Sequence, residues 1–203
     1  MRLARAISAL GVVFLLLGGF LLWRGYSADA RAGEAARELL ARLPAPNVSS
    51  ADVSSPAAPE LDVSSADVSS EDEWDALAGR VLGVLSIPVL DLELPVLDSC
   101  TDELLELSVC RYAGSPPTET DGASGFVLAG HSFDSQFGRL PRLRPGDEIL
   151  FRTLSGQETR YEVEECAEIS ADPAGLDAET RPLTLFTCTF DGSARFLIHA
   201  GRS

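Results

Sequence analysis

The stretch Leu183-Thr184-Leu185-Phe186-Thr187-Cys188 decides the fold of this chain. It is a short apolar run, rich in β-forming residues, that ends at a thiol. After Thr189 comes the turn Phe190-Asp191-Gly192-Ser193, and a second apolar run begins after it. Two such runs around a short turn predict a β-hairpin. The hairpin would carry Cys188 to the rim of a sheet and return Arg195 beside it on the next strand.

Similar short runs, separated by turn residues, recur along the chain and include the second strand of this hairpin. They predict strands at Val81–Ile87, Leu90–Leu97, Phe126–Ala129, Glu148–Leu154, Glu158–Glu164 and Ala194–Ala200. Short helical or loop segments are expected at Thr101–Leu107, Gln136–Leu143 and Asp172–Glu179. Many short strands with turn signals between them are typical of an all-β domain that forms a closed or nearly closed β-barrel with short helices.

The N-terminus has the composition of a membrane segment. Ile7 to Trp23 is almost wholly apolar and uncharged, near the lower limit of ~17–25 residues for a membrane-spanning helix. We predict an anchor or signal segment over residues 1–26, and a short helix over residues 27–42. Ala28-Asp29-Ala30 resembles a signal-peptidase site, so cleavage after Ala30 is the alternative. The long apolar run favours the uncleaved anchor.

A low-complexity linker separates this region from the predicted domain. Residues 48–55, Val-Ser-Ser-Ala-Asp-Val-Ser-Ser, recur as residues 63–70. The stretch from 43 to 75 has acidic but no basic residues, which indicates a disordered, solvated stalk. The barrel domain is therefore expected at residues 76–203. A formal net charge of −15 argues against nucleic-acid binding.

Three residues carry the candidate chemistry: a nucleophile, a proton shuttle and a charge stabiliser. A cysteine that ends an apolar strand is more often a small core residue. Here Cys188 reaches a turn, and Arg195 follows closely. Of the two histidines, His131 ends another apolar run. His199 lies four strand residues beyond Arg195, about 13 Å away, so we assign the shuttle to His131.

These residues resemble the sortases, the cysteine transpeptidases of bacterial surfaces. Thr184-Leu185-Phe186-Thr187-Cys188 matches the family's TLxTC signature, and Ala129-Gly130-His131 matches its histidine segment. Arg195 falls where the family has its active-site arginine, and Gly83–Pro88 resembles an opening strand. The short link from Cys188 to Arg195 looks most like class D or class B-type sortases.

The resemblance implies a function and a location. Cys188 would attack a backbone carbonyl in an LPxTG-like sorting motif, forming a thioester, and His131 would shuttle protons. Arg195 would stabilise the oxyanion, and Thr187 would position the substrate. The partners would be surface proteins with a C-terminal sorting signal and an amine from a peptidoglycan precursor or a pilin lysine. The enzyme would be a single-pass membrane protein with its catalytic domain outside the cell, cleaving and transferring without a cofactor.

Several alternatives stay open at this point. A non-catalytic surface β-barrel that binds surface proteins or pilins would keep the same residues. A thiol oxidoreductase would need a second cysteine near Cys188, and none lies within several residues. Cys100 and Cys110 would pair in an exported domain if their Cα separation allows it. Calcium dependence is not excluded, although the loop charges Asp172, Asp177 and Glu179 are better explained as solvated.

Overall fold

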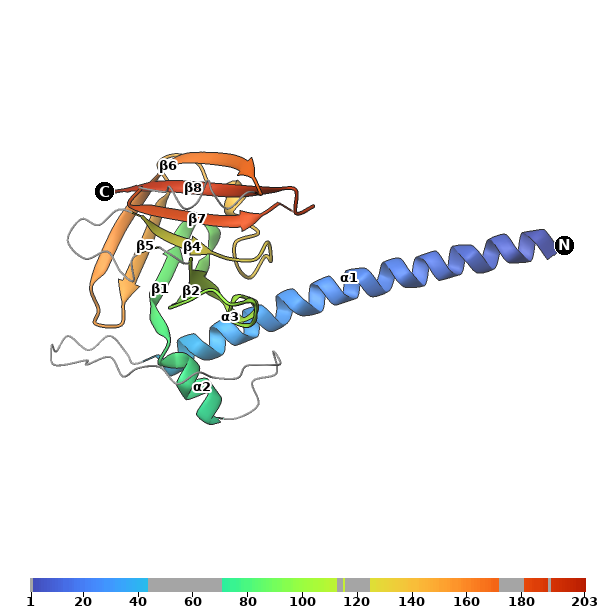
Figure 1. Ribbon diagram of the computed structural model, residues 1–203, viewed down its shortest axis with the longest axis horizontal. Helices are drawn as coiled ribbons and strands as arrows, with labels where there is room; N and C mark the ends of the chain where they lie inside the picture. The colour runs from blue at the N-terminus through green and yellow to red at the C-terminus, as the bar shows by residue number, and fades with distance from the viewer. Residues whose placement is uncertain (1, 44–70, 113–114, 116–124, 172–180, 190) are drawn as a thin grey trace.

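The centre of the molecule is a closed β-barrel. The structure, a computed structural model, describes residues 2–43, 71–112, 115, 125–171, 181–189 and 191–203. Within them the barrel has the strand order β1-β2-β3-β4-β7-β8-β6-β5 (Figure 1). The strands are β1 (Val81–Ile87), β2 (Leu92–Leu97), β3 (Val109–Arg111), β4 (Phe126–Ala129), β5 (Glu148–Thr153), β6 (Glu158–Ser170), β7 (Leu183–Cys188) and β8 (Ala194–Arg202). The helices are α1 (Arg2–Arg42), α2 (Glu71–Ala78), α3 (Asp102–Leu107) and two 3₁₀ turns, η1 (Pro88–Leu90) and η2 (Leu140–Arg142). The predicted barrel is confirmed.

Strand β7 lies between two strands that run in opposite directions. β4 pairs with it in parallel, with Ala129 opposite Phe186. β8 pairs with it in antiparallel fashion, with Cys188 opposite Arg195. A parallel pair ends at one rim of the barrel, so the residues after β4 and the end of β7 lie together. The sequence had predicted both strands but not their parallel pairing.

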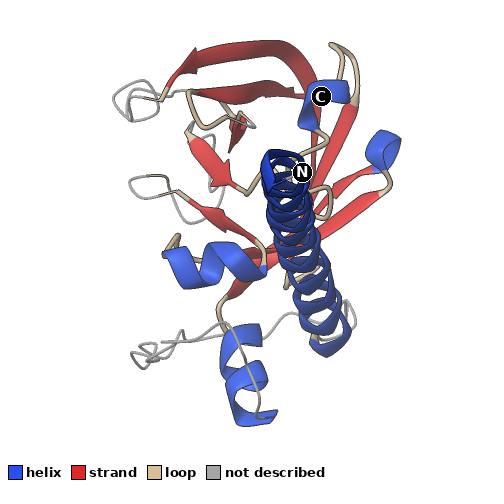
Figure 2. Ribbon diagram, turned by 90° about the vertical axis from the view of Figure 1, so that its right-hand side faces the viewer, coloured by secondary structure: helices blue, strands red, loops and turns tan. Residues whose placement is uncertain are grey.

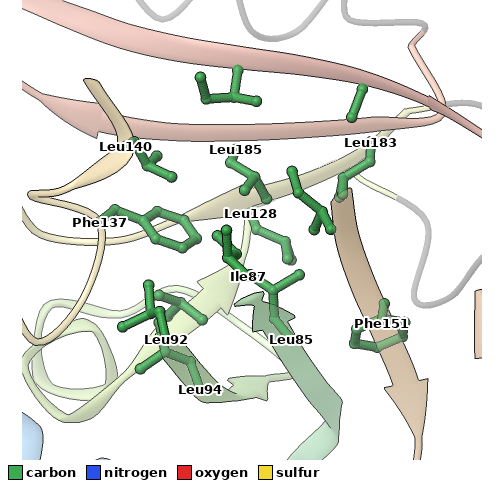
Figure 3. Packing of buried hydrophobic residues seen from close by; sticks show 14 of the residues in the cluster. Leu85, Ile87, Leu92, Leu94, Leu128, Phe137, Leu140, Phe151, Leu183 and Leu185 are labelled. Atoms are coloured by element: carbon green, nitrogen blue, oxygen red, sulfur yellow. The ribbon is translucent and has the colours of Figure 1, made fainter. Parts of the chain in front are cut away.

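Apolar side chains pack on both faces of these strands. The larger buried cluster includes Leu85, Leu128, Phe151 and Leu185, from four different strands, and Figure 3 shows their side chains converging. Burying each such side chain contributes roughly 1.5–3 kcal/mol. Alternation puts the next residues of β4 and β7 on the opposite face, where Phe186 packs in a second cluster with residues of the helices. The helices are thus part of the domain's core.

α1 is one continuous helix with two unlike halves. The side chains from Val12 to Tyr26 are exposed although many are apolar, and Figure 1 shows this half extending away from the barrel. Ala32, Ala36 and Leu39 in the other half are buried against the domain. Gly11–Arg42 is long and apolar enough to cross a membrane. The helix therefore runs without a break through the segments expected as anchor and as juxtamembrane helix.

The end of α1 is tied to α2. The Arg42 guanidinium forms ion pairs with Glu38 at 2.8 Å, with Glu71 at 2.7 Å and with Asp75 at 3.0 Å. Residues 44–70, where most of the stalk was expected, lie outside the described residues. The described residues on the two sides of this segment lie together, because Arg42 pairs with Glu71.

α3 is a short helix fastened at both ends. The Thr101 hydroxyl accepts a hydrogen bond from the Leu104 N–H at 3.3 Å, which caps the helix N-terminus. A disulfide between Cys100 and Cys110, with Cα atoms 5.2 Å apart, encloses it. The sequence had left open whether Cys100 and Cys110 pair, and in the structure they do.

β6 is the strand that differs most from expectation, because it continues to Ser170. It pairs with β5 from Glu158 to Glu162 and with β8 from Tyr161 to Ser170, with a register shift between Val163 and Glu165. The shift breaks the alternation on which the sequence prediction relied. The segment expected at Asp172–Glu179 falls largely outside the described residues.

Candidate active site

Cys188 and Arg195 face each other at the rim of the barrel. They are directly opposite residues of β7 and β8, and such pairs project to the same face of a sheet. Cys188 is exposed and its thiol is free. A thiol in this position is open to a substrate that approaches the rim.

His131 arrives at the same rim on the other side of β7. Ala129 pairs with Phe186, and the Gly130 N–H continues the ladder by donating to the Phe186 carbonyl at 3.1 Å. His131 and Cys188 each lie two residues beyond the paired Ala129 and Phe186. The register therefore brings His131, Cys188 and Arg195 to one level on three adjacent chain segments.

The Arg195 guanidinium contacts an aromatic ring and has one nitrogen without a hydrogen-bond partner among the described residues. Its guanidinium carbon lies 5.5 Å from the centre of the Phe186 ring, within the range of a cation–π contact. Tyr112 packs edge-on against the same ring at 5.4 Å. The Arg195 Nη1 atom is buried, and no hydrogen-bond partner for it occurs among the described residues. The guanidinium can therefore donate to a substrate oxygen without breaking an existing bond.

The surroundings of His131 favour the neutral imidazole. The ring is partly buried and lies 4.8 Å, centre to centre, from the Phe133 ring. Burial lowers the pKa of His131 below its ordinary value, and the charges of Glu106 and Asp102 on α3 partly oppose this. A small protonated fraction is thus available near neutral pH for a proton-transfer step.

Gln136 is a site residue that the sequence analysis missed. Its side chain is fully buried. Its Oε1 accepts a hydrogen bond from the His131 N–H at 2.8 Å, and its Nε2 donates to the Leu105 carbonyl at 3.0 Å. It therefore ties the histidine segment to α3. A Cβ at Gly130 would lie 2.7 Å from the Phe137 ring, which explains the glycine before His131.

The family model described as "Sortase domain" matches residues 85–203, which include all three rim residues. The chain belongs to the sortase family. Its relatives include sortase D of Bacillus subtilis (strain 168), 31% identical over 61% of this chain and 65% of that protein. Sortase A of Bacillus anthracis is 30% identical over 59% of this chain and 58% of that protein. The chain thus spans less than two thirds of both relatives.

Solved sortases share the fold. The lid mutant of Streptococcus agalactiae sortase C1 superposes with a TM-score of 0.55 at 23% identity, over 61% of this chain and 69% of that one. The predicted family is confirmed, and sortase D is among the classes that the sequence resembles.

Thr187 and His199, the other two polar residues considered from the sequence, do not share the rim face with His131, Cys188 and Arg195. Thr187 lies on the opposite face of β7 from Cys188, where it is buried. Its Oγ1 finds no hydrogen-bond partner among the residues that the structure describes. His199 pairs across the strands with Thr184, whose hydroxyl lies 3.3 Å from His199 Nδ1. His199 therefore lies within the sheet, away from Cys188 and Arg195.

The described residues of this sortase form no metal site. No group of three or more His, Cys, Asp or Glu side chains there is arranged to hold an ion. The loop acids Asp172, Asp177 and Glu179, considered for calcium, lie outside the described residues.

Proposed function

We propose that this protein is a membrane-anchored sortase that cleaves an LPxTG-like sorting motif through a thioester on Cys188 and transfers the acyl group to an amine. The observation that carries the proposal is the register of three neighbouring segments. It sets an exposed thiol between an arginine with a spare donor and a half-buried histidine. These groups can serve as the nucleophile, the proton shuttle and the oxyanion stabiliser of cysteine acyl transfer.

The first half-reaction forms the thioester. The Cys188 thiolate attacks the carbonyl carbon of the scissile peptide bond, and the carbonyl oxygen takes the negative charge. Arg195, with a backbone N–H near the end of β7, stabilises that oxyanion. Protonated His131 gives its proton to the departing amine as the C–N bond breaks. The products are an acyl-enzyme and the free C-terminal part of the donor.

The second half-reaction transfers the acyl group. An incoming amine attacks the thioester carbonyl, and His131, now neutral, accepts a proton from it. The C–S bond breaks, the thiolate returns, and a new amide joins donor and acceptor. We propose the amine of a peptidoglycan precursor or a pilin lysine as the acceptor. No step needs a cofactor.

Thr187 remains the proposed substrate-positioning residue. Its buried hydroxyl lies next to Cys188 in the chain and makes no hydrogen bond within the described structure. A shift at the end of β7 when substrate binds would allow it to find a partner.

Two observations support an uncleaved anchor and an extracytoplasmic domain. Cleavage after Ala30 would remove Asp29, whose carboxylate accepts hydrogen bonds from the Asp134 and Ser135 N–H groups. The disulfide between Cys100 and Cys110 is typical of an oxidising compartment.

The test uses the full chain in lipid nanodiscs. We would mix it with a pool of LPxTG-like peptides, with and without triglycine, and measure intact protein mass and peptide products. A thioester mass that is absent in Cys188→Ala and is discharged by triglycine supports the proposal. Peptide binding without any adduct or cleavage would favour the non-catalytic binding protein instead. Thiol labelling of wild type and His131→Ala would verify that Cys188 is accessible in both.

A further inference from the structure

The direction of α1 shows which side of the barrel faces the membrane. In Figure 1 the free half of α1 leaves the domain toward the side at which the β7 arrow ends, and Figure 2 looks at the molecule from that side. The apolar side chains of this half are exposed on all sides of the helix, as for Phe14, Leu16 and Leu22. A bilayer around them would lie in front of the rim that carries Cys188.

The rim lies close to that bilayer. Trp23 and Tyr26 end the apolar half, as aromatic residues do at a membrane interface. Asp29 comes three residues later, about 4.5 Å further along the helix axis. It already binds the segment after His131, because its carboxylate accepts the Ser135 N–H at 2.9 Å. The histidine segment is therefore about one helical turn from the interface.

The attachment of the barrel to α1 is rigid over this distance. Gly33 packs so closely that a Cβ there would lie 3.1 Å from that of Ser135. Ala36 and Leu39 are buried in the domain, and Arg42 closes the contact with α2. Arg42 and Glu71, which lie on either side of residues 44–70 in the sequence, are paired at this docked region. The length of the segment between them therefore does not set the distance between the membrane and the barrel.

We infer that α1 is a rigid arm that holds the Cys188 rim against the bilayer surface. The orientation of the rim does not depend on the proposed activity.

Orientation can be measured without catalysis. In full-length protein carrying Cys166→Ser, a fluorophore is attached to Cys188, and the protein is placed in vesicles whose lipids carry a spin label in the headgroup. A matched protein with Cys188→Ser and Cys166→Ser carries the fluorophore at Ser155→Cys, in the turn between β5 and β6. Figure 1 shows that turn on the side away from the free half of α1. We expect strong quenching at position 188 and little at 155. Equal quenching, or the reverse order, overturns the inference.

Two insertions of equal length test the rigid arm. Seven helix-forming residues inserted between Tyr26 and Ser27 add two turns, roughly 11 Å, and keep the helix faces nearly in phase. The same residues inserted between the two repeats of segment 44–70 are the control. We expect the first insertion to abolish quenching at Cys188 and the second to leave it unchanged. Loss of quenching with the second insertion alone would show that the linker is a spacer and would overturn the inference.

Discussion

Asp29 and Ser135 are joined by two hydrogen bonds across more than half of the chain. The Ser135 N–H donates to the Asp29 carboxylate at 2.9 Å, and the Ser135 hydroxyl donates to the Asp29 carbonyl at 3.0 Å. The carboxylate also accepts the Asp134 N–H at 3.2 Å. One acid of α1 thus orders the segment that follows His131. A mobile stalk could not give this order.

We expect Asp29→Ala to loosen the histidine segment. Two backbone N–H groups lose their acceptor, and hydrogen bonds to a charged group contribute roughly 1.5–3 kcal/mol each at most. Partial exposure and replacement by water reduce this to about 1–2 kcal/mol of unfolding free energy. Urea unfolding and kcat/KM for a sorting-motif peptide both measure the effect. Glu34→Ala, an exposed acid on the same helix, is the control. Equal losses in both variants would contradict the assigned role.

A second prediction concerns the protonation of His131. Glu106 raises the pKa of His131 against the larger, lowering effect of burial. We therefore expect Glu106→Gln to lower that pKa further and to reduce kcat/KM at neutral pH, because less imidazolium is present. NMR titration of the ring proton, assigned with His131→Gln, measures the shift. Glu103→Gln, on the same helix, should have little effect. A wild-type His131 that titrates above 6.5 would contradict the assignment.

The same lowered pKa makes stability depend on pH. Below the ordinary histidine value of 6.5, the unfolded chain binds this proton more readily than the folded protein does. We expect the stability contribution of His131 to be fully present above that value and to decrease as pH falls to the lowered pKa. His131→Gln should flatten the unfolding free energy over this window. An unchanged pH slope in that variant would show that other groups are responsible.

For Arg195 we expect Lys to be a poor substitute. A lysine has no planar group to stack on Phe186 and cannot donate in the same fork. If Arg195 stabilises the oxyanion, Arg195→Lys should lower kcat/KM by roughly 10²–10³-fold. Arg181→Lys, which alters an arginine paired with Glu164 and Glu165, controls for the general change. Full activity in Arg195→Lys would remove the guanidinium from the mechanism.

Several strands of this fold could be predicted from the sequence, because their apolar residues lie between turn residues. The strands β1 and β7 are short apolar runs bounded by turn residues, so composition alone located both ends. β6 was predicted too short because its register shift at Glu164 places consecutive acidic residues where alternation was expected. Local pattern describes a strand well only while its pairing stays regular.

The sequence indicated candidate residues for the site but not the contacts that hold them in place. Cys188 and Arg195 were linked by a hairpin, which is a local feature. The meeting of His131 with Cys188 depends on parallel pairing between β4 and β7, and such long-range pairing leaves no local pattern. Gln136 was missed because a glutamine in a loop looks solvated, and only the packed structure shows it buried. Asp29 was considered only as part of a cleavage site.

We expect the disulfide to stabilise the domain and not to take part in chemistry. Cys100 and Cys110 are separated by 10 residues in sequence, and closing so short a loop contributes roughly 2–3 kcal/mol. The double variant Cys100→Ser, Cys110→Ser should lose about that much unfolding free energy, and reductant should then have no further effect on it. Cys166→Ser, at a free cysteine, is the control. A double variant as stable as wild type would contradict this role.

For Gln136 we expect two substitutions to differ in how their stability depends on pH. Gln136→Leu loses both hydrogen bonds and should cost about 1–3 kcal/mol. Gln136→Glu keeps an acceptor for the His131 N–H, but its ionised carboxylate would face the Leu105 carbonyl, which also only accepts. Burial raises the pKa of such a carboxyl, and once protonated it can donate to Leu105. The Glu variant should therefore gain stability relative to the Leu variant as pH falls through that raised pKa, and His131-dependent peptide cleavage should recover with it. Parallel pH dependence of unfolding in the two variants would show that Gln136 fills space without bridging His131 to α3.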